Sequence, residues 1–124
     1  MTDGREKLDD PASILVVDDE KHVAEGLQAV LDGEGYEVDV ARDGEEAWEL
    51  LRENSYGLAL IDLKLPELGG LELFERIREG ELGCEVIIIT GEGSVDSAVE
   101  VMRNGAYDYL TKPLEMERLK ALVP

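Results

Sequence analysis

The chain has 124 residues, of which 30 are acidic and 12 basic, so its formal net charge at pH 7 is −18. This excess of negative charge argues against direct binding of a nucleic-acid backbone or an anionic membrane. No apolar run approaches membrane-spanning length, residues 1–12 have no apolar signal-peptide core, and the lone Cys84 cannot form an internal disulfide, so we expect one cytoplasmic domain.

Five short apolar segments alternate along the chain with five segments of helical periodicity. Residues 1–12 are polar and show no periodicity, so we expect a flexible tail before a domain formed by residues 13–124. We predict strands at residues 13–17, 36–40, 57–63, 86–89 and 106–110. Helices are predicted in the four intervening segments, and a fifth helix begins at Leu114 and is truncated by the end of the chain.

The spacing of apolar residues predicts which face of each helix packs inward. In the third helix we expect burial of Leu71, Phe74 and Ile77. In the fourth helix the predicted inward face comprises Val95, Ala98, Val99 and Met102. Asp43 is a suitable N-cap for the second helix, because its carboxylate can accept a hydrogen bond from a free backbone N–H.

Strands that alternate with helices through short connections are typical of a parallel sheet with right-handed crossovers. We therefore predict an α/β fold in which helices cover both faces of a five-stranded parallel sheet, giving three layers. In open sheets of this kind, ligands bind at the carboxyl ends of the strands, near the point where the strand order reverses.

Polar side chains gather at that edge, at the ends of four of the five predicted strands. They are Asp18 and Asp19 after the first strand, Asp62 after the third, Thr90 after the fourth and Lys112 after the fifth. Each would be unremarkable alone, but neighbouring carboxylates repel one another unless a cation neutralises them. Mg²⁺ is the favoured cation, because it binds through few carboxylates and keeps waters, whereas Ca²⁺ needs more oxygen ligands and Zn²⁺ prefers Cys or His.

Four short motifs in order along the chain are VVDDE at residues 16–20, IDLKLP at 61–66, ITG at 89–91 and YLTKP at 109–113. Together they resemble the signature of receiver domains of two-component response regulators, over about residues 13–122. The sequence around the second and fourth motifs is most similar to that of receivers of the nitrogen-regulation type. Those receivers are usually followed by an ATPase that activates sigma-54 polymerase and by a DNA-binding domain.

The resemblance implies a doubly wound, flavodoxin-like fold with strand order 2-1-3-4-5 and a signalling role. It implies that Asp62 accepts a phosphoryl group from a sensor histidine kinase or a small donor, with only slow autodephosphorylation as enzymatic activity. The implied Mg²⁺ ligands are Asp18, Asp19, Asp62 and the backbone carbonyl of Lys64. The implied phosphoryl-binding residues are Thr90, Gly91 and Lys112, with a cis peptide bond before Pro113.

The resemblance also implies a conformational switch through Thr90 and Tyr109. Movement of the threonine toward the phosphoryl group would let the tyrosine ring turn inward. The surface of the fourth helix, fifth strand and fifth helix would then change, form a homodimer and control an output domain. Lys64 and Glu92 would flank the path of water to phosphorus. They could pair and hinder that water, or Glu92 could orient it, and both alternatives stay open.

Two other functions fit part of the pattern. A Mg²⁺-dependent phosphohydrolase with an aspartate nucleophile would, in the haloacid dehalogenase class, usually carry a second aspartate two residues after the first, where this chain has Lys64. A receiver-like interaction module that works without phosphorylation would be expected to lack one of the acidic or lysine positions, and none is missing.

Overall fold

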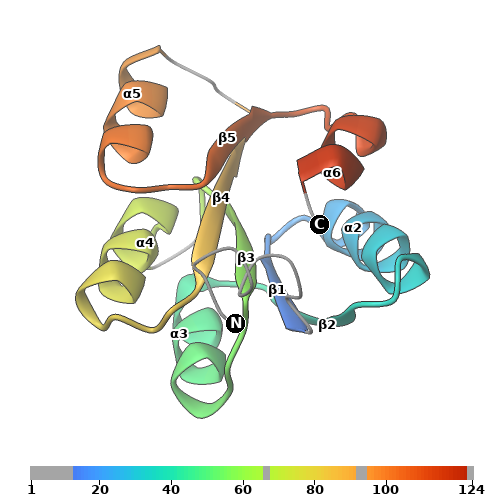
Figure 1. Ribbon diagram of the computed structural model, residues 1–124, viewed down its shortest axis with the longest axis horizontal. Helices are drawn as coiled ribbons and strands as arrows, with labels where there is room; N and C mark the ends of the chain where they lie inside the picture. The colour runs from blue at the N-terminus through green and yellow to red at the C-terminus, as the bar shows by residue number, and fades with distance from the viewer. Residues whose placement is uncertain (1–12, 66–67, 92–94, 123–124) are drawn as a thin grey trace, which may run out of the picture.

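The computed structural model describes residues 13–65, 68–91 and 95–122 (Figure 1), so that the predicted tail and Glu92 lie outside the described residues. The strands in this part are β1 (Ser13–Val17), β2 (Glu37–Ala41), β3 (Leu58–Asp62), β4 (Glu85–Thr90) and β5 (Asp108–Thr111). The helices are α2 (Lys21–Gly33), α3 (Gly44–Glu53), α4 (Gly70–Glu79), α5 (Val95–Arg103) and α6 (Met116–Leu122). Strands and helices alternate as predicted.

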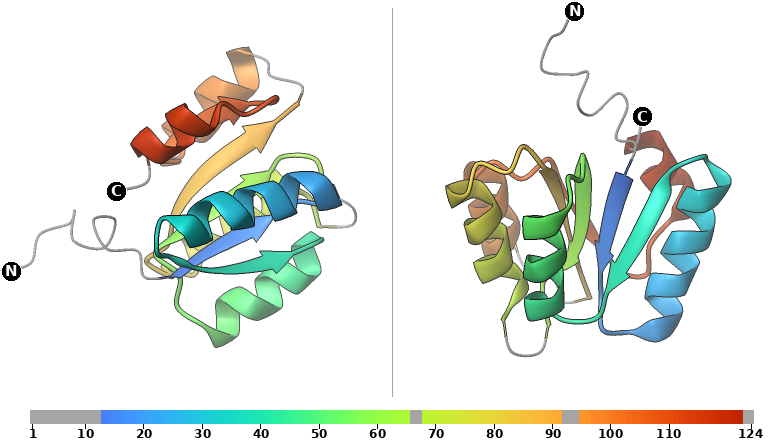
Figure 2. Two further views of the ribbon diagram at one scale, coloured as in Figure 1. Left: turned by 90° about the vertical axis from the view of Figure 1, so that its right-hand side faces the viewer. Right: turned by 90° about the horizontal axis from the view of Figure 1, so that it is seen from below.

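The strands form one sheet in the order β2-β1-β3-β4-β5, and every neighbouring pair is parallel. Helices α2 and α6 cover one face, and α3, α4 and α5 cover the other (Figures 1 and 2). The predicted three-layer fold and strand order are confirmed. The order reverses next to β1, which lies between β2 and β3, and this is the place where open α/β sheets bind ligands.

Strand β3 occupies the centre of the sheet, and all five of its residues are buried. Ala59 and Ile61 belong to the apolar cluster beneath α3, α4 and α5, whereas Leu58 and Leu60 belong to the cluster beneath α2 and α6. A strand covered on both faces needs an unbroken apolar run, which explains this sequence. The run carries Asp62 to the edge of the sheet.

The predicted inward face of α5 is wrong at Val99 and Met102, whereas Ala98 is half-buried. Val99 and Met102 are 44% and 45% exposed, whereas Val101 is fully buried, and the side chain of Val95 lies outside the described part. The amide of Ala106 donates to the carbonyl oxygen of Val101. This bond closes the turn after α5, and Val101 packs into the apolar cluster beneath α3, α4 and α5, so the side of the helix that carries Val101 faces the sheet.

The third helix also differs from its prediction at one position. Phe74 and Ile77 of α4 are buried as predicted, but Leu71 is exposed and Leu73 is buried. Gly70 packs against the backbone at the end of β3, and residues three, four and seven positions later share its helix face. Leu71 therefore points away from the sheet.

Helix α3 begins as predicted, with Asp43 as its N-cap. The Asp43 carboxylate accepts a hydrogen bond from the backbone N–H of Glu46 at 2.8 Å, and the Glu46 carboxylate accepts one from the backbone N–H of Arg42 at 2.9 Å. The two bonds satisfy N–H groups at the open end of the helix. In the described ranges, no helix has the length and apolarity needed to cross a membrane.

Candidate functional site

Buried polar residues lie at the carboxyl edge of the sheet, where the sequence predicted them. Asp62 and Thr90 end β3 and β4, and Asp18 directly follows β1. These three are the buried polar or charged residues among those described. Lys112 follows β5, and its amide donates to the Thr90 carbonyl oxygen at 2.8 Å, while the amide of Leu63 donates to the carbonyl oxygen of Ile89 at 2.8 Å. The sheet ladder thus continues into the site.

The Lys112 ammonium lies among three carboxylates. Its Nζ donates to Glu20 Oε1 at 2.6 Å and to Asp62 Oδ2 at 3.0 Å, and it lies 3.2 Å from Asp18 Oδ2. The other oxygen of each aspartate is held by the main chain. Asp62 Oδ1 accepts from the amide of Lys64 at 3.1 Å, and Asp18 Oδ1 accepts from the amide of Glu20 at 2.8 Å. Both buried carboxylates are therefore fixed in orientation.

The electrostatics of the cluster follow from burial and from charge. Burial raises the pKa of Asp18, and the nearby charge of Asp62 raises it further, against the opposing effects of the hydrogen bond from the Glu20 amide and of the adjacent Lys112 ammonium. Burial disfavours the charged form of Lys112, but its contacts with the carboxylates of Glu20, Asp62 and Asp18 outweigh burial and raise the pKa of Lys112 above the usual lysine value. Three carboxylates face one ammonium, so the cluster keeps an excess of negative charge.

The same cluster fits a small hard cation. One oxygen from each of Asp18, Glu20 and Asp62 lies within 4.8 Å of the others. Asp18 Oδ2 is buried, and its contact with the Lys112 ammonium has the distance of an ion pair but not the geometry of a hydrogen bond. A buried, incompletely satisfied carboxylate oxygen beside two further carboxylates is the donor set that Mg²⁺ accepts.

Glu20 is the residue that the sequence interpretation left out of the site. Asp19, predicted as a direct metal ligand, is exposed and lines the hollow at the strand ends, but Glu20 is the residue grouped with Asp18 and Asp62. A signal was present in the sequence, because Glu20 is the third acidic residue in a row and occupies the N-cap position of α2, where glutamate is not a usual capping residue.

The other predicted site residues also lie at or near this edge. Thr90 is buried, and Gly91, Lys64 and Lys112 line the hollow together with Asp62. Among the described residues, a Cβ at position 91 would meet only Lys112 Cδ within 4 Å, at 3.9 Å, so these residues leave space beside Gly91. The Lys112–Pro113 peptide bond is cis, the isomer that the sequence implied.

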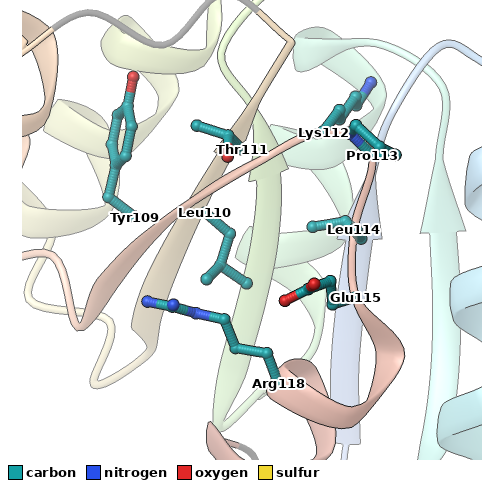
Figure 3. A pocket seen from close by; sticks show the side chains of 8 residues that line it. All are labelled: Tyr109, Leu110, Thr111, Lys112, Pro113, Leu114, Glu115 and Arg118. Carbon is teal, nitrogen blue, oxygen red and sulfur yellow. The ribbon is translucent and has the colours of Figure 1, made fainter.

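Tyr109 lies on β5 at the side of the site. Its ring is half-buried against the apolar cluster beneath α3, α4 and α5, and its hydroxyl is buried without a hydrogen-bond partner among the described residues. Figure 3 shows Tyr109 and Lys112 projecting in different directions from the chain segment that borders a cavity of about 420 Å³ between β5 and α6. The cavity is lined by Tyr109, Leu110, Thr111, Lys112, Pro113, Leu114, Glu115 and Arg118.

Comparisons with known proteins agree on one family. The family model of the response regulator receiver domain matches residues 14–124. The chain is 40% identical over 110 residues to the transcriptional regulatory protein DltR of Streptococcus agalactiae, covering 89% of this chain and 49% of DltR. It is 40% identical over 112 residues to the transcriptional regulatory protein ZraR of Escherichia coli, covering 90% of this chain and 25% of ZraR. The chain thus spans about half the length of DltR and a quarter of ZraR.

A solved structure gives the same result for the fold. The beryllofluoride-activated receiver domain dimer of NtrC4, determined in solution, superposes with a TM-score of 0.85 at 37% sequence identity. The alignment covers 90% of this chain and 93% of that one.

Proposed function

Because this chain belongs to the response regulator receiver domain family, we propose that it is a phosphorylation-activated switch whose acceptor is Asp62. The observation that carries the proposal is the setting of the Asp62 carboxylate. It is buried at the ligand-binding edge of the sheet, oriented by the Lys64 amide, and 3.0 Å from the ammonium of Lys112. A nucleophile needs such fixed orientation, and a phosphoryl group needs a cation at that distance.

In the proposed reaction, a carboxylate oxygen of Asp62 attacks the phosphorus of a phosphohistidine on a sensor histidine kinase. The phosphorus–nitrogen bond breaks, the histidine leaves with the electron pair, and an acyl phosphate forms on Asp62. Acetyl phosphate would serve as a small donor, with acetate as the leaving group. Lys112 then pairs with one phosphoryl oxygen, and the Thr90 hydroxyl, beside the open space at Gly91, donates to another.

The acidic cluster would hold Mg²⁺ during this transfer. Its proposed ligands are Asp18, Asp19, Asp62 and the backbone carbonyl of Lys64, and the cluster of carboxylates supports Asp18 and Asp62 among them. The bound cation would supply charge neutralisation between the carboxylates and the incoming phosphoryl oxygens.

The proposed output is a change in the surface of α5, β5 and α6. Thr90 would move toward the phosphoryl group, and Tyr109 would turn inward. The Tyr109 hydroxyl is buried and has no hydrogen-bond partner in the described part of the chain, which supports a second position for the ring. The exposed apolar side chains of Val99 and Met102 support a surface that contacts a partner. Phosphorylation would shift the equilibrium between the two conformations, because the phosphoryl group makes different contacts in each of them.

The lifetime of the acyl phosphate is proposed to depend on Lys64 and Glu92. The side chain of Lys64 is exposed beside Asp62, where it could screen phosphorus from water, and Glu92 lies outside the described residues. Slow autodephosphorylation would then reset the switch.

The proposed partners are a sensor histidine kinase in the cytoplasm and an output domain that regulates transcription. DltR and ZraR are both transcriptional regulatory proteins of greater length, which supports an output domain attached to or contacting this one. The dimer of the activated NtrC4 receiver supports a homodimer on activation. The negative charge of this chain supports assigning any DNA contact to the output domain.

Mass spectrometry after incubation with acetyl phosphate and MgCl₂ tests the proposal. We expect one added phosphoryl group, no addition in Asp62→Asn, and no addition when EDTA removes the cation. The control is Asp32→Asn, which removes an exposed carboxylate at the C-terminal end of α2 and should leave the modification unchanged. Sustained turnover of phosphate esters would instead indicate a phosphohydrolase, and failure to modify the wild-type protein would indicate a module that works without phosphorylation.

A further inference from the structure

The Lys112 ammonium lies among three carboxylates before any phosphoryl group arrives. An ammonium has three N–H donors. Three carboxylates surround Nζ, at 2.6 Å for Glu20, 3.0 Å for Asp62 and 3.2 Å for Asp18. Two of the donors are hydrogen-bonded, to Glu20 and Asp62, and the third N–H lies near Asp18, so a phosphoryl oxygen would compete with these carboxylates for the ammonium.

The three carboxylates differ in the free energy that their separation from the Lys112 ammonium would cost. The side chains of Asp18 and Asp62 are 2% and 5% exposed, so separating either from the ammonium would leave a buried charge without its partner. The side chain of Glu20 is 59% exposed, so its carboxylate can return to water. Glu20 is therefore the partner that can be exchanged.

The local structure at Glu20 supports a dedicated role for its side chain. Glu20 is the N-cap residue of α2, but its side chain makes no capping hydrogen bond. Its backbone N–H holds Asp18, and its carboxylate reaches across to Lys112, 92 positions later in the chain. The side chain is committed to the lysine and not to its own helix.

We propose that Glu20 is a positioning residue that holds Lys112 over unphosphorylated Asp62 and releases it to the phosphoryl group. This inference rests on the proposed function. Glu20 thereby competes with the phosphoryl group for the same ammonium. Its carboxylate also adds to the negative charge that attracts the cation, so the competition must be measured with MgCl₂ at saturation.

Beryllofluoride binding, followed by ¹⁹F NMR at saturating MgCl₂, measures this competition without turnover. We expect Glu20→Gln to bind beryllofluoride about two- to fivefold more tightly than wild type, the range given by an exposed ion pair. Glu25→Gln removes one charge from an exposed position of the same helix and is the matched control. It should bind like wild type.

Glu20→Asp separates the ion pair from a general effect of charge. Aspartate keeps the charge, but its side chain is one methylene shorter and favours capping α2, so it should no longer hold the lysine. We expect Glu20→Asp to bind beryllofluoride as tightly as Glu20→Gln.

The beryllofluoride affinities of the variants test the role of Glu20, and that of the wild type tests the proposed function. Unchanged or weaker binding by Glu20→Gln would overturn the proposed role of Glu20, as would wild-type affinity in Glu20→Asp or equal tightening in Glu25→Gln. A wild-type protein that binds no beryllofluoride would overturn the proposed function itself.

Discussion

Replacing Gly70 with alanine tests whether α4 rests directly on the strand end that carries Asp62. Gly70 is the first residue of α4, and its amide donates to the carbonyl oxygen of Leu63 at 3.2 Å. A Cβ at position 70 would lie 2.4 Å from the carbonyl oxygen of Asp62 and 2.8 Å from Cα of Leu63. Both are backbone atoms at the end of a central strand, so neither can rotate out of the way.

The magnitude follows from the distance by which the helix must recede. A Cβ essentially never lies closer than 3.0 Å to such an atom, so the start of α4 must move by at least 0.6 Å, the difference between 3.0 Å and 2.4 Å. Overpacking costs about 1–3 kcal/mol, and backbone obstruction places Gly70→Ala near the upper value. Alanine returns about 1 kcal/mol through its higher helix propensity. We expect the free energy of unfolding to fall by about 2 kcal/mol.

Equilibrium unfolding in urea measures this change, with the slope against urea concentration compared between proteins. Gly69→Ala is the matched control, because a Cβ at position 69 would have no heavy atom of the described residues within 4 Å and the φ angle there is −73°. It should change the free energy of unfolding by less than about 1 kcal/mol. We also expect slower modification of Asp62 by acetyl phosphate in Gly70→Ala alone. If Gly70→Ala were as stable as wild type, the close packing of α4 on the strand end would be refuted.

Two further predictions concern the core and the cysteine. Val101→Ala should lower the free energy of unfolding by about 2 kcal/mol, because the side chain is buried. Val99→Ala should lower it by less than about 0.5 kcal/mol, because this side chain is exposed. If urea unfolding showed a larger loss for Val99→Ala than for Val101→Ala, the helix face predicted from sequence would be restored. Burial raises the pKa of Cys84 to about 12, so the rate of its alkylation by iodoacetamide should keep rising above pH 9. At pH 8 the folded protein should react about a thousandfold more slowly than the urea-unfolded protein. A rate that reaches a plateau near pH 9 in the folded protein would contradict the raised pKa.

The fold could be predicted because its signals are local. The unbroken apolar run of β3 indicated a strand covered on both faces, and the polar residues that follow the strands indicated the edge at which they meet. The strand limits moved by only a few residues. The start of β5 moved the furthest, because Ala106 is bonded to the end of α5 and the ladder with β4 begins at Asp108.

Helix rotation and side-chain pairing could not be read from the same signals. Val99 and Met102 repeat at helical spacing as well as buried residues do, and only the contact of α5 with β5 selects Val101 instead. The pairing of Glu20 with Lys112 joins residues 92 positions apart. Sequence spacing placed both residues near one edge of the sheet, but the choice among three acidic neighbours of β1 depends on the backbone path into α2.

The main-chain bonds from Leu63 to Ile89 and from Lys112 to Thr90 have a consequence for the timescale of signalling. They extend the sheet ladder one step beyond the strands, so these amides share the protection of the core against hydrogen exchange. We therefore expect the backbone beneath Asp62 to open locally less often than the loops at the same edge. Faster conformational changes at this edge should involve side chains and loops. We therefore expect the proposed change of surface to take place without separation of the central strands.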